Sequence, residues 1–151
     1  YKRQHKKENV IMNKKQKSLT NKGFSLVELI IVIAIMAVLI GVLAPQYLKY
    51  VKNSKISTDI QNAEEIATAV NVAIADGQLK PTGDTTLTGP GAVTGIDNLT
   101  SIPSSKVDST YSWTVTYNKD GVKNITLGAS GAEKEIYPDA TSSGHYQDAN
   151  K

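Results

Sequence analysis

The chain has 151 residues, a formal net charge of +3, no cysteine and only two histidines, His5 and His145. The lack of cysteine excludes disulfide scaffolds, thiolate nucleophiles and cysteine-rich zinc sites. Two histidines near opposite ends of the chain argue against a histidine-built catalytic or metal centre. We therefore predict that the protein is not an enzyme and has no catalytic residues, cofactor or metal site.

The charges are distributed unevenly along the chain. Residues 1–23 contain eight of the 17 lysine and arginine residues but only one of the 14 acidic residues. The rest of the chain is consequently net acidic. A nucleic-acid-binding domain would instead spread basic residues over a folded face, with aromatic residues among them. We therefore predict no nucleic-acid binding.

A long apolar run follows this basic segment. Residues 24–44 read FSLVELIIVIAIMAVLIGVLA, in which only Ser25, Glu28 and Gly41 are not apolar. As a helix the run would cover about 31 Å, close to the thickness of the hydrocarbon core of a bilayer. The preceding lysines match a cytoplasmic flank, so we expect a single membrane span with the N-terminus inside the cell.

Two other interpretations of the run are weaker. A helix in the core of a soluble domain usually keeps a polar stripe, which this segment lacks. A cleavable secretory signal has a shorter apolar region, and here Pro45 directly follows the only small-residue site at which a signal could be cut.

Glu28 is the unusual residue of the span, because a carboxylate in an apolar membrane segment is costly and usually marks a function. No basic side chain lies within two helical turns on its C-terminal side. A cut just before Phe24 would create an α-ammonium group four residues away. An opposite charge within about 4–6 Å would keep the carboxylate ionised, so processing could supply its partner.

The segment KGFSLVE at residues 22–28, with basic residues before it and an apolar run ending at Pro45, resembles the N-terminus of a type IV prepilin. The resemblance covers residues 14 to about 76. It implies cleavage by a prepilin peptidase between Gly23 and Phe24, and N-methylation of Phe24. It further implies that Glu28 sets the register during assembly and that Pro45 bends the helix.

The resemblance also implies partners and a location. The precursor would cross the cell membrane once, then join a homo-oligomeric helical fibre outside the cell, built by an assembly platform and its ATPase machinery. The basic leader would be residues 1–23. We expect the true start at Met12, because Lys7-Glu8 can be encoded by a ribosome-binding sequence at a suitable distance.

The segment from residue 45 to 76 changes from apolar on all sides to apolar on one side. Its apolar residues recur at steps of three and four, which predicts an amphipathic continuation of the helix ending near Asp76-Gly77. Polar residues such as Lys52, Asp59, Glu64 and Glu65 fall between the apolar ones. Because proline lacks an N–H, we expect a kink or a break between Gly41 and Pro45, and the resemblance implies that this stretch melts in the fibre.

The remaining sequence predicts a small β-rich part. Residues 77–110 are rich in Gly, Thr and Pro and are assigned to a loop between helix and sheet, either functional or partly structured. Within 111–151, two alternating runs around the turn 118–121 predict a β-hairpin, residues 135–137 a weaker third strand, and the last dozen residues a loose tail. We expect Trp113 and its same-face neighbours to cover the helix.

Together these features predict an α+β fold, in which a long N-terminal helix carries a small antiparallel sheet. The function that we predict is that of a structural subunit of a type IV pilus. A pseudopilin of a type II secretion or DNA-uptake system shares every N-terminal feature and remains open, as does an uncleaved single-pass anchor that displays a binding domain. The lack of cysteine departs from the disulfide-bounded C-terminal region of many Gram-negative pilins and favours a Gram-positive source.

Overall fold

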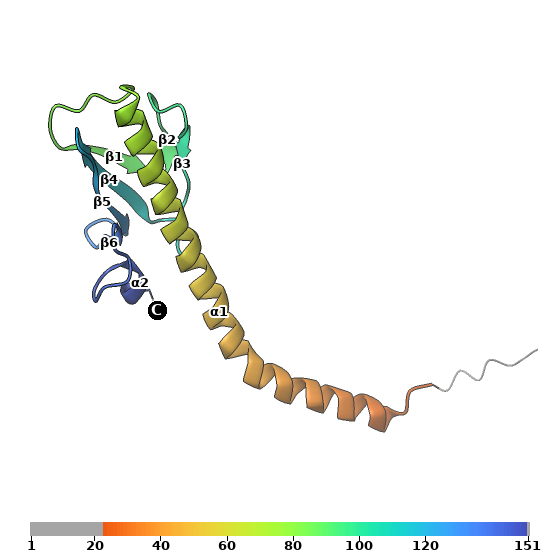
Figure 1. Cartoon of the computed structure of the whole chain (residues 1–151). Coiled ribbons are helices and arrows are strands. Elements are labelled where there is room, and N and C mark those ends of the chain that lie inside the picture. The colour runs from red at the N-terminus through yellow and green to blue at the C-terminus, as the bar shows by residue number, and fades with distance from the viewer. Residues whose placement is uncertain (1–22, 151) are drawn as a thin grey trace, which may run out of the picture. The chain divides into compact units, whose positions relative to one another are not determined.

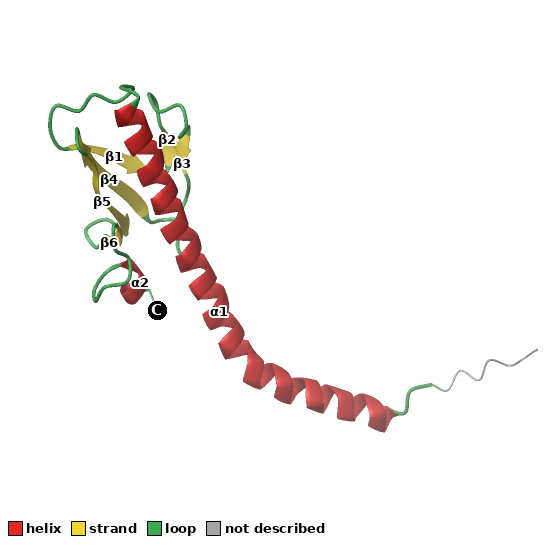
Figure 2. Cartoon of the chain, in the orientation of Figure 1, coloured by secondary structure: helices red, strands yellow, loops and turns green. Residues whose placement is uncertain are grey.

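The computed structural model describes residues 23–150, so the predicted leader and start site lie outside the described residues apart from Gly23. Figures 1 and 2 show one long helix, α1, and a β-rich part that we call the head, residues 77–150. The chain divides into two units at Ile40 and Gly41. The elements are α1 (Leu26–Ala75), β1 (Thr85–Gly89), β2 (Gly91–Ala92), β3 (Ser101–Ile102), β4 (Ser112–Asn118), β5 (Gly121–Gly128), β6 (Lys134–Tyr137) and α2 (Tyr146–Ala149).

Helix α1 runs without interruption through Gly41 and Pro45. The break that we considered at this point is therefore not present in the isolated chain. Pro45 has no N–H to donate to the carbonyl of Gly41 four residues earlier, and its ring crowds that carbonyl. The helix therefore lacks one backbone hydrogen bond at this turn. That the turn melts within a fibre stays a prediction.

Helix α1 ends where the sequence predicts. Gly77 has a φ of +73°, the left-handed conformation that favours glycine after a helix. Its N–H donates to the carbonyl of Ile74 at 3.1 Å, and the N–H of Gln78 donates to the carbonyl of Ala73 at 2.9 Å. These two bonds form a Schellman motif, which satisfies the last carbonyls of the helix and turns the chain toward the head.

The head contains a four-stranded antiparallel sheet in the order β1-β4-β5-β6, and a two-stranded sheet of β2 and β3. The predicted hairpin is confirmed as β4 and β5, with Trp113 opposite Leu127 and Val115 opposite Ile125. The predicted third strand is β6. The loop assigned to residues 77–110 instead contains β1, β2 and β3, so the partly structured alternative holds.

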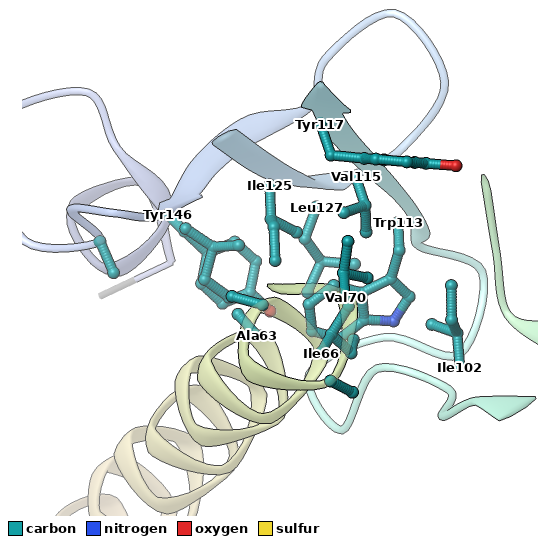
Figure 3. Close-up of a cluster of buried hydrophobic side chains, with 14 of the residues drawn as sticks. Ala63, Ile66, Val70, Ile102, Trp113, Val115, Tyr117, Ile125, Leu127 and Tyr146 are labelled. Atoms are coloured by element: carbon teal, nitrogen blue, oxygen red, sulfur yellow. The ribbon is translucent and has the colours of Figure 1, made fainter. Parts of the chain in front are cut away.

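The core lies between the C-terminal half of α1 and the sheet (Figure 3). Trp113 is fully buried, and its indole N–H donates to the carbonyl of Pro103 at 2.8 Å. Since its only polar atom is satisfied, Trp113 serves in packing, as expected. The large side chains that meet here are Ile66 and Val70 from α1 and Trp113, Val115, Ile125 and Leu127 from the sheet.

The C-terminal residues are not the loose tail that we expected. Tyr146, the first residue of α2, is fully buried, and Ala140 is 5% exposed. Tyr146 also forms a buried hydrogen bond with α1, described below. A buried aromatic side chain contributes a large apolar area, which fixes this segment onto the core despite its polar composition.

Replacing Gly128, the last residue of β5, with alanine is expected to destabilise the head. An added Cβ would lie 2.8 Å from Cα of Glu133 and 2.9 Å from the carbonyl oxygen of Ala132. Both are backbone atoms, so the turn at residues 129–133 must shift, at a cost of about 1–3 kcal/mol. Thermal unfolding followed by circular dichroism in detergent measures the loss. Gly83→Ala is the control, because nothing lies within 4 Å of its Cβ position.

Candidate functional site

The start of α1 forms a capping box. The N–H of Ser25 donates to Oε2 of Glu28 at 2.8 Å, and the N–H of Val27 donates to Oγ of Ser25 at 3.3 Å. Two of the N–H groups at the helix start are thereby satisfied reciprocally. Glu28 therefore has a partner within its own helix, in addition to any partner that processing would create.

The proposed cleavage site lies immediately before this cap. Gly23 and Phe24 precede the helix and are both exposed, Phe24 by 88% of its surface. A Cβ added at Gly23 would meet nothing within 4 Å. The fold of the described residues thus does not itself require a glycine at position 23, and any such requirement would come from an enzyme that reads the segment.

The apolar first half of α1 has no cover within the described residues. Its most apolar 18-residue window has a mean hydropathy of 3.1, and none of that window is buried. A core helix of a soluble domain would be mostly buried, so this finding argues against that alternative. An exposed apolar surface of this size requires lipid or other protein chains around it.

A second polar site, which the sequence analysis missed, lies beneath the head. The amphipathic pattern predicts Asp59 among the polar residues between the apolar ones, but its side chain is fully buried. Its carboxylate accepts four hydrogen bonds: from Oγ of Ser105 at 2.6 Å, from the N–H of Lys106 at 2.7 Å, from the N–H of Val107 at 3.2 Å, and from the Tyr146 hydroxyl at 2.7 Å. Burial removes the water around this carboxylate, and the four donors compensate for that loss.

Asp59 joins three segments that are distant in the sequence. They are α1, the loop at residues 105–107 and the C-terminal helix α2. Burial raises the pKa of the Tyr146 phenol above its usual 10, and the hydrogen bond to Asp59 raises it further. The hydroxyl of Tyr146 therefore keeps its proton and donates a hydrogen bond to Asp59. In a chain without cysteine, this cluster holds the C-terminal segment against the helix.

Comparisons with known proteins identify the N-terminal part. The model of a family described as the prokaryotic N-terminal methylation motif matches residues 19–44, which include Gly23, Phe24, Glu28 and Gly41. The type IV major fimbrial protein FimA of Dichelobacter nodosus is 37% identical over 57 residues, 38% of this chain and 36% of that protein. This chain thus spans about a third of the length of the first curated relatives that it matches.

Two other relatives match over longer segments. A fimbrial protein of Dichelobacter nodosus is 31% identical over 119 residues, 76% of this chain and 72% of that protein. A prepilin peptidase-dependent protein A of Clostridium perfringens is 40% identical over 73 residues, 46% of this chain and 51% of that protein. No solved structure matches significantly.

The described residues combine a capped, uncovered apolar helix, its amphipathic continuation and a small antiparallel head, which is the architecture of a membrane-inserted subunit. The match to a fimbrial protein over three quarters of the chain identifies the family of this subunit. The chain belongs to the type IV pilin family.

Proposed function

We propose that the protein is a structural subunit of a type IV pilus, made as a membrane-inserted prepilin. The precursor is cleaved after Gly23, methylated at Phe24 and polymerised through α1. The observation that carries this proposal is the wholly exposed apolar half of α1, which begins with an accessible Gly23-Phe24 segment and carries one carboxylate, Glu28. The match to a methylation motif over this segment supports it.

The same apolar surface serves two environments in this proposal. Before assembly it lies in lipid, with the basic leader and the N-terminus on the cytoplasmic side. After cleavage it leaves the membrane and packs against the helices of sister subunits, which bury the same apolar area. The new ammonium group of Phe24 in one subunit then meets Glu28 of a neighbour in a low-dielectric environment, where opposite charges attract more strongly than in water.

The proposal includes three partners outside the fibre: a prepilin peptidase, an assembly platform and an ATPase. Membership of the pilin family supports them, as does the printed name of the Clostridium perfringens relative, which describes that protein as dependent on a prepilin peptidase. The exposed Gly23-Phe24 segment precedes α1, so such a peptidase could reach it without unfolding the helix.

The test is the intact mass and N-terminal sequence of the protein recovered from membranes and from sheared surface material. We expect a methylated Phe24 at the N-terminus of the chain in sheared fibres. A cleaved chain found only in the cell envelope would instead favour the pseudopilin alternative. An uncut chain confined to membranes, in cells with an active peptidase, would indicate a plain anchor and overturn the proposal.

A further inference from the structure

A short stretch of α1 is uncovered between the apolar run and the part of the helix that packs against the head. Ile56 is the first buried residue of α1, and none of residues 46–55 is buried. Tyr47 and Tyr50 in this stretch are 67% and 71% exposed. Exposed tyrosines directly after an apolar span are typical of a membrane–water interface, where the ring lies among the lipid headgroups and the hydroxyl meets water.

The same stretch is basic. Residues 46–58 contain three lysines and no acidic residue. Neither Lys49 nor Lys55 forms a salt bridge within residues 23–150, whereas Lys52 interacts within its own chain. Two lysines are thus available to a partner outside the chain. We call the four side chains Tyr47, Lys49, Tyr50 and Lys55 the collar.

The collar lies at the depth of the lipid headgroups when the apolar run spans the membrane. Along the helix axis, Tyr47 is about 4.5 Å and Tyr50 about 9 Å beyond Ala44, the last residue of the run. The headgroup layer on each side of a bilayer is about 5–8 Å thick. Lys55 is about 16 Å beyond Ala44, but helix side chains lean toward the N-terminus, which here is toward the membrane. A Debye length of about 8 Å bridges the distance that remains.

The collar surrounds the helix instead of marking one face of it. At about 100° per residue, its four side chains leave no gap wider than about 120° around the axis. A contact with one neighbouring protein would gather its residues on one side, as the buried residues Ile56, Asp59 and Ala63 are gathered under the head. Lipid surrounds a single membrane span on all sides, so the arrangement favours lipid as the partner.

Lys49 lies at a hollow that suits a phosphate group. The hollow has a volume of about 280 Å³ and is lined by Gln46, Lys49, Tyr50 and Asn53. Each of these side chains can donate a hydrogen bond, and none is a carboxylate. A phospholipid phosphate would therefore meet one ammonium group and three neutral donors here.

We propose that the collar binds the headgroups of anionic phospholipids at the outer face of the cell membrane, and that this contact fixes the depth of the subunit before assembly. The inference rests on the membrane insertion in the proposed function. Residues 24–48 contain no lysine or arginine, so after removal of the leader the collar carries the basic residues nearest to the apolar run. It lies on the side on which the subunit leaves the membrane, so assembly carries neither lysine through the hydrocarbon core.

A single cysteine in place of Ala44 reports this depth, because the natural chain has no cysteine. The full chain with Ala44→Cys is placed in lipid nanodiscs of phosphatidylcholine, with or without phosphatidylglycerol. The rate of its reaction with a polyethylene-glycol maleimide, which is uncharged and does not enter the bilayer, is then measured. We expect phosphatidylglycerol to slow the reaction at least about fivefold, since each lysine near an anionic surface favours binding by about that factor.

Charge reversal in the same background identifies the residues responsible. In K49E/K55E the slowing by phosphatidylglycerol should vanish, because like charges then face the phosphates. The control K80E/K119E makes the same change of charge at the other end of α1 and should keep the slowing. Lys80 lies beside Gly77, and Lys119 lines one hollow together with Ala75.

The tyrosines of the collar are tested separately from its charge. Y47A/Y50A removes both rings from the interface and leaves Lys49 and Lys55 in place. We expect its cysteine to react severalfold faster than that of the natural background, with or without phosphatidylglycerol. Unchanged thermal unfolding would show that the head remains folded, since both tyrosines are exposed.

The failures of the two proposals are distinguishable. If K49E/K55E responds to phosphatidylglycerol as the natural background does, the lysines do not contact the headgroups and the inference is overturned. If Ala44→Cys reacts in nanodiscs as fast as Gly83→Cys, in an exposed loop of the head, the membrane insertion fails and the proposed function with it. A chain that is neither cleaved nor assembled, but keeps the response to phosphatidylglycerol, would be a plain anchor and leave the inference standing.

Discussion

Replacing Asp59 with alanine is expected to destabilise the head by about 3–5 kcal/mol, the largest loss that we expect from a single polar residue. The change leaves four donors without an acceptor: the hydroxyls of Ser105 and Tyr146 and two backbone N–H groups. Each buried donor without a partner costs about 1–3 kcal/mol, partly offset by water that enters. Urea denaturation in detergent measures the loss, with the fluorescence of Trp113, the only tryptophan, as the signal.

Two further variants separate the charge of Asp59 from its shape. Asp59→Asn keeps one carbonyl acceptor but turns an amide NH₂ toward donors, so we expect a loss close to that of alanine. Tyr146→Phe removes one donor and leaves the carboxylate with three, at a cost of about 1 kcal/mol. Glu64→Ala, on the exposed side of the same helix, is the control and should change stability by less than about 0.5 kcal/mol. A similarly small change for Asp59→Ala would show that the cluster does not hold the head together.

The elements that the sequence predicted are those with a local signal. The alternation of residues 111–117 and the turn after Asn118 identify the hairpin without knowledge of the rest of the chain. Strand β1 has no such signal, because Leu87 is the only large apolar residue in Thr85–Gly89. Its conformation comes from pairing with β4, a tertiary contact that propensity cannot show.

The sequence predicts the segment with Gly23, Phe24 and Glu28 as a candidate site, but it does not predict the hydrogen-bond cluster around Asp59. Gly23, Phe24 and Glu28 lie in one short motif, and the pattern S-x-x-E at residues 25–28 also encodes the capping box. Asp59 lies three residues after Ile56 and four before Ala63, which places it on the buried stripe. That position could have indicated its burial. Its partners could not be read from the sequence, because they lie 46 to 87 residues further along the chain.

Glu28→Ala is expected to lower the yield of surface fibres by about a thousandfold and to leave membrane insertion and cleavage at Gly23 intact. In the proposed fibre the carboxylate pairs with the Phe24 ammonium of a neighbour. Two unit charges 4 Å apart attract by about 4 kcal/mol at an effective dielectric constant of about 20, and each 1.4 kcal/mol corresponds to about tenfold in an equilibrium. Fibre yield after shearing and the N-terminal sequence of the membrane-bound chain measure the two outcomes.

The capping box requires a control, because Glu28→Ala also removes the acceptor of the Ser25 N–H. Glu28→Gln keeps an oxygen in reach of that N–H but has no charge, whereas Ser25→Ala keeps the charge and removes the hydroxyl half of the cap. If charge is what assembly needs, Glu28→Gln fails as fully as Glu28→Ala, and Ser25→Ala forms fibres. The reverse pattern, with normal fibres from Glu28→Gln and few from Ser25→Ala, would mean that Glu28 serves the helix start of its own subunit rather than the register between subunits.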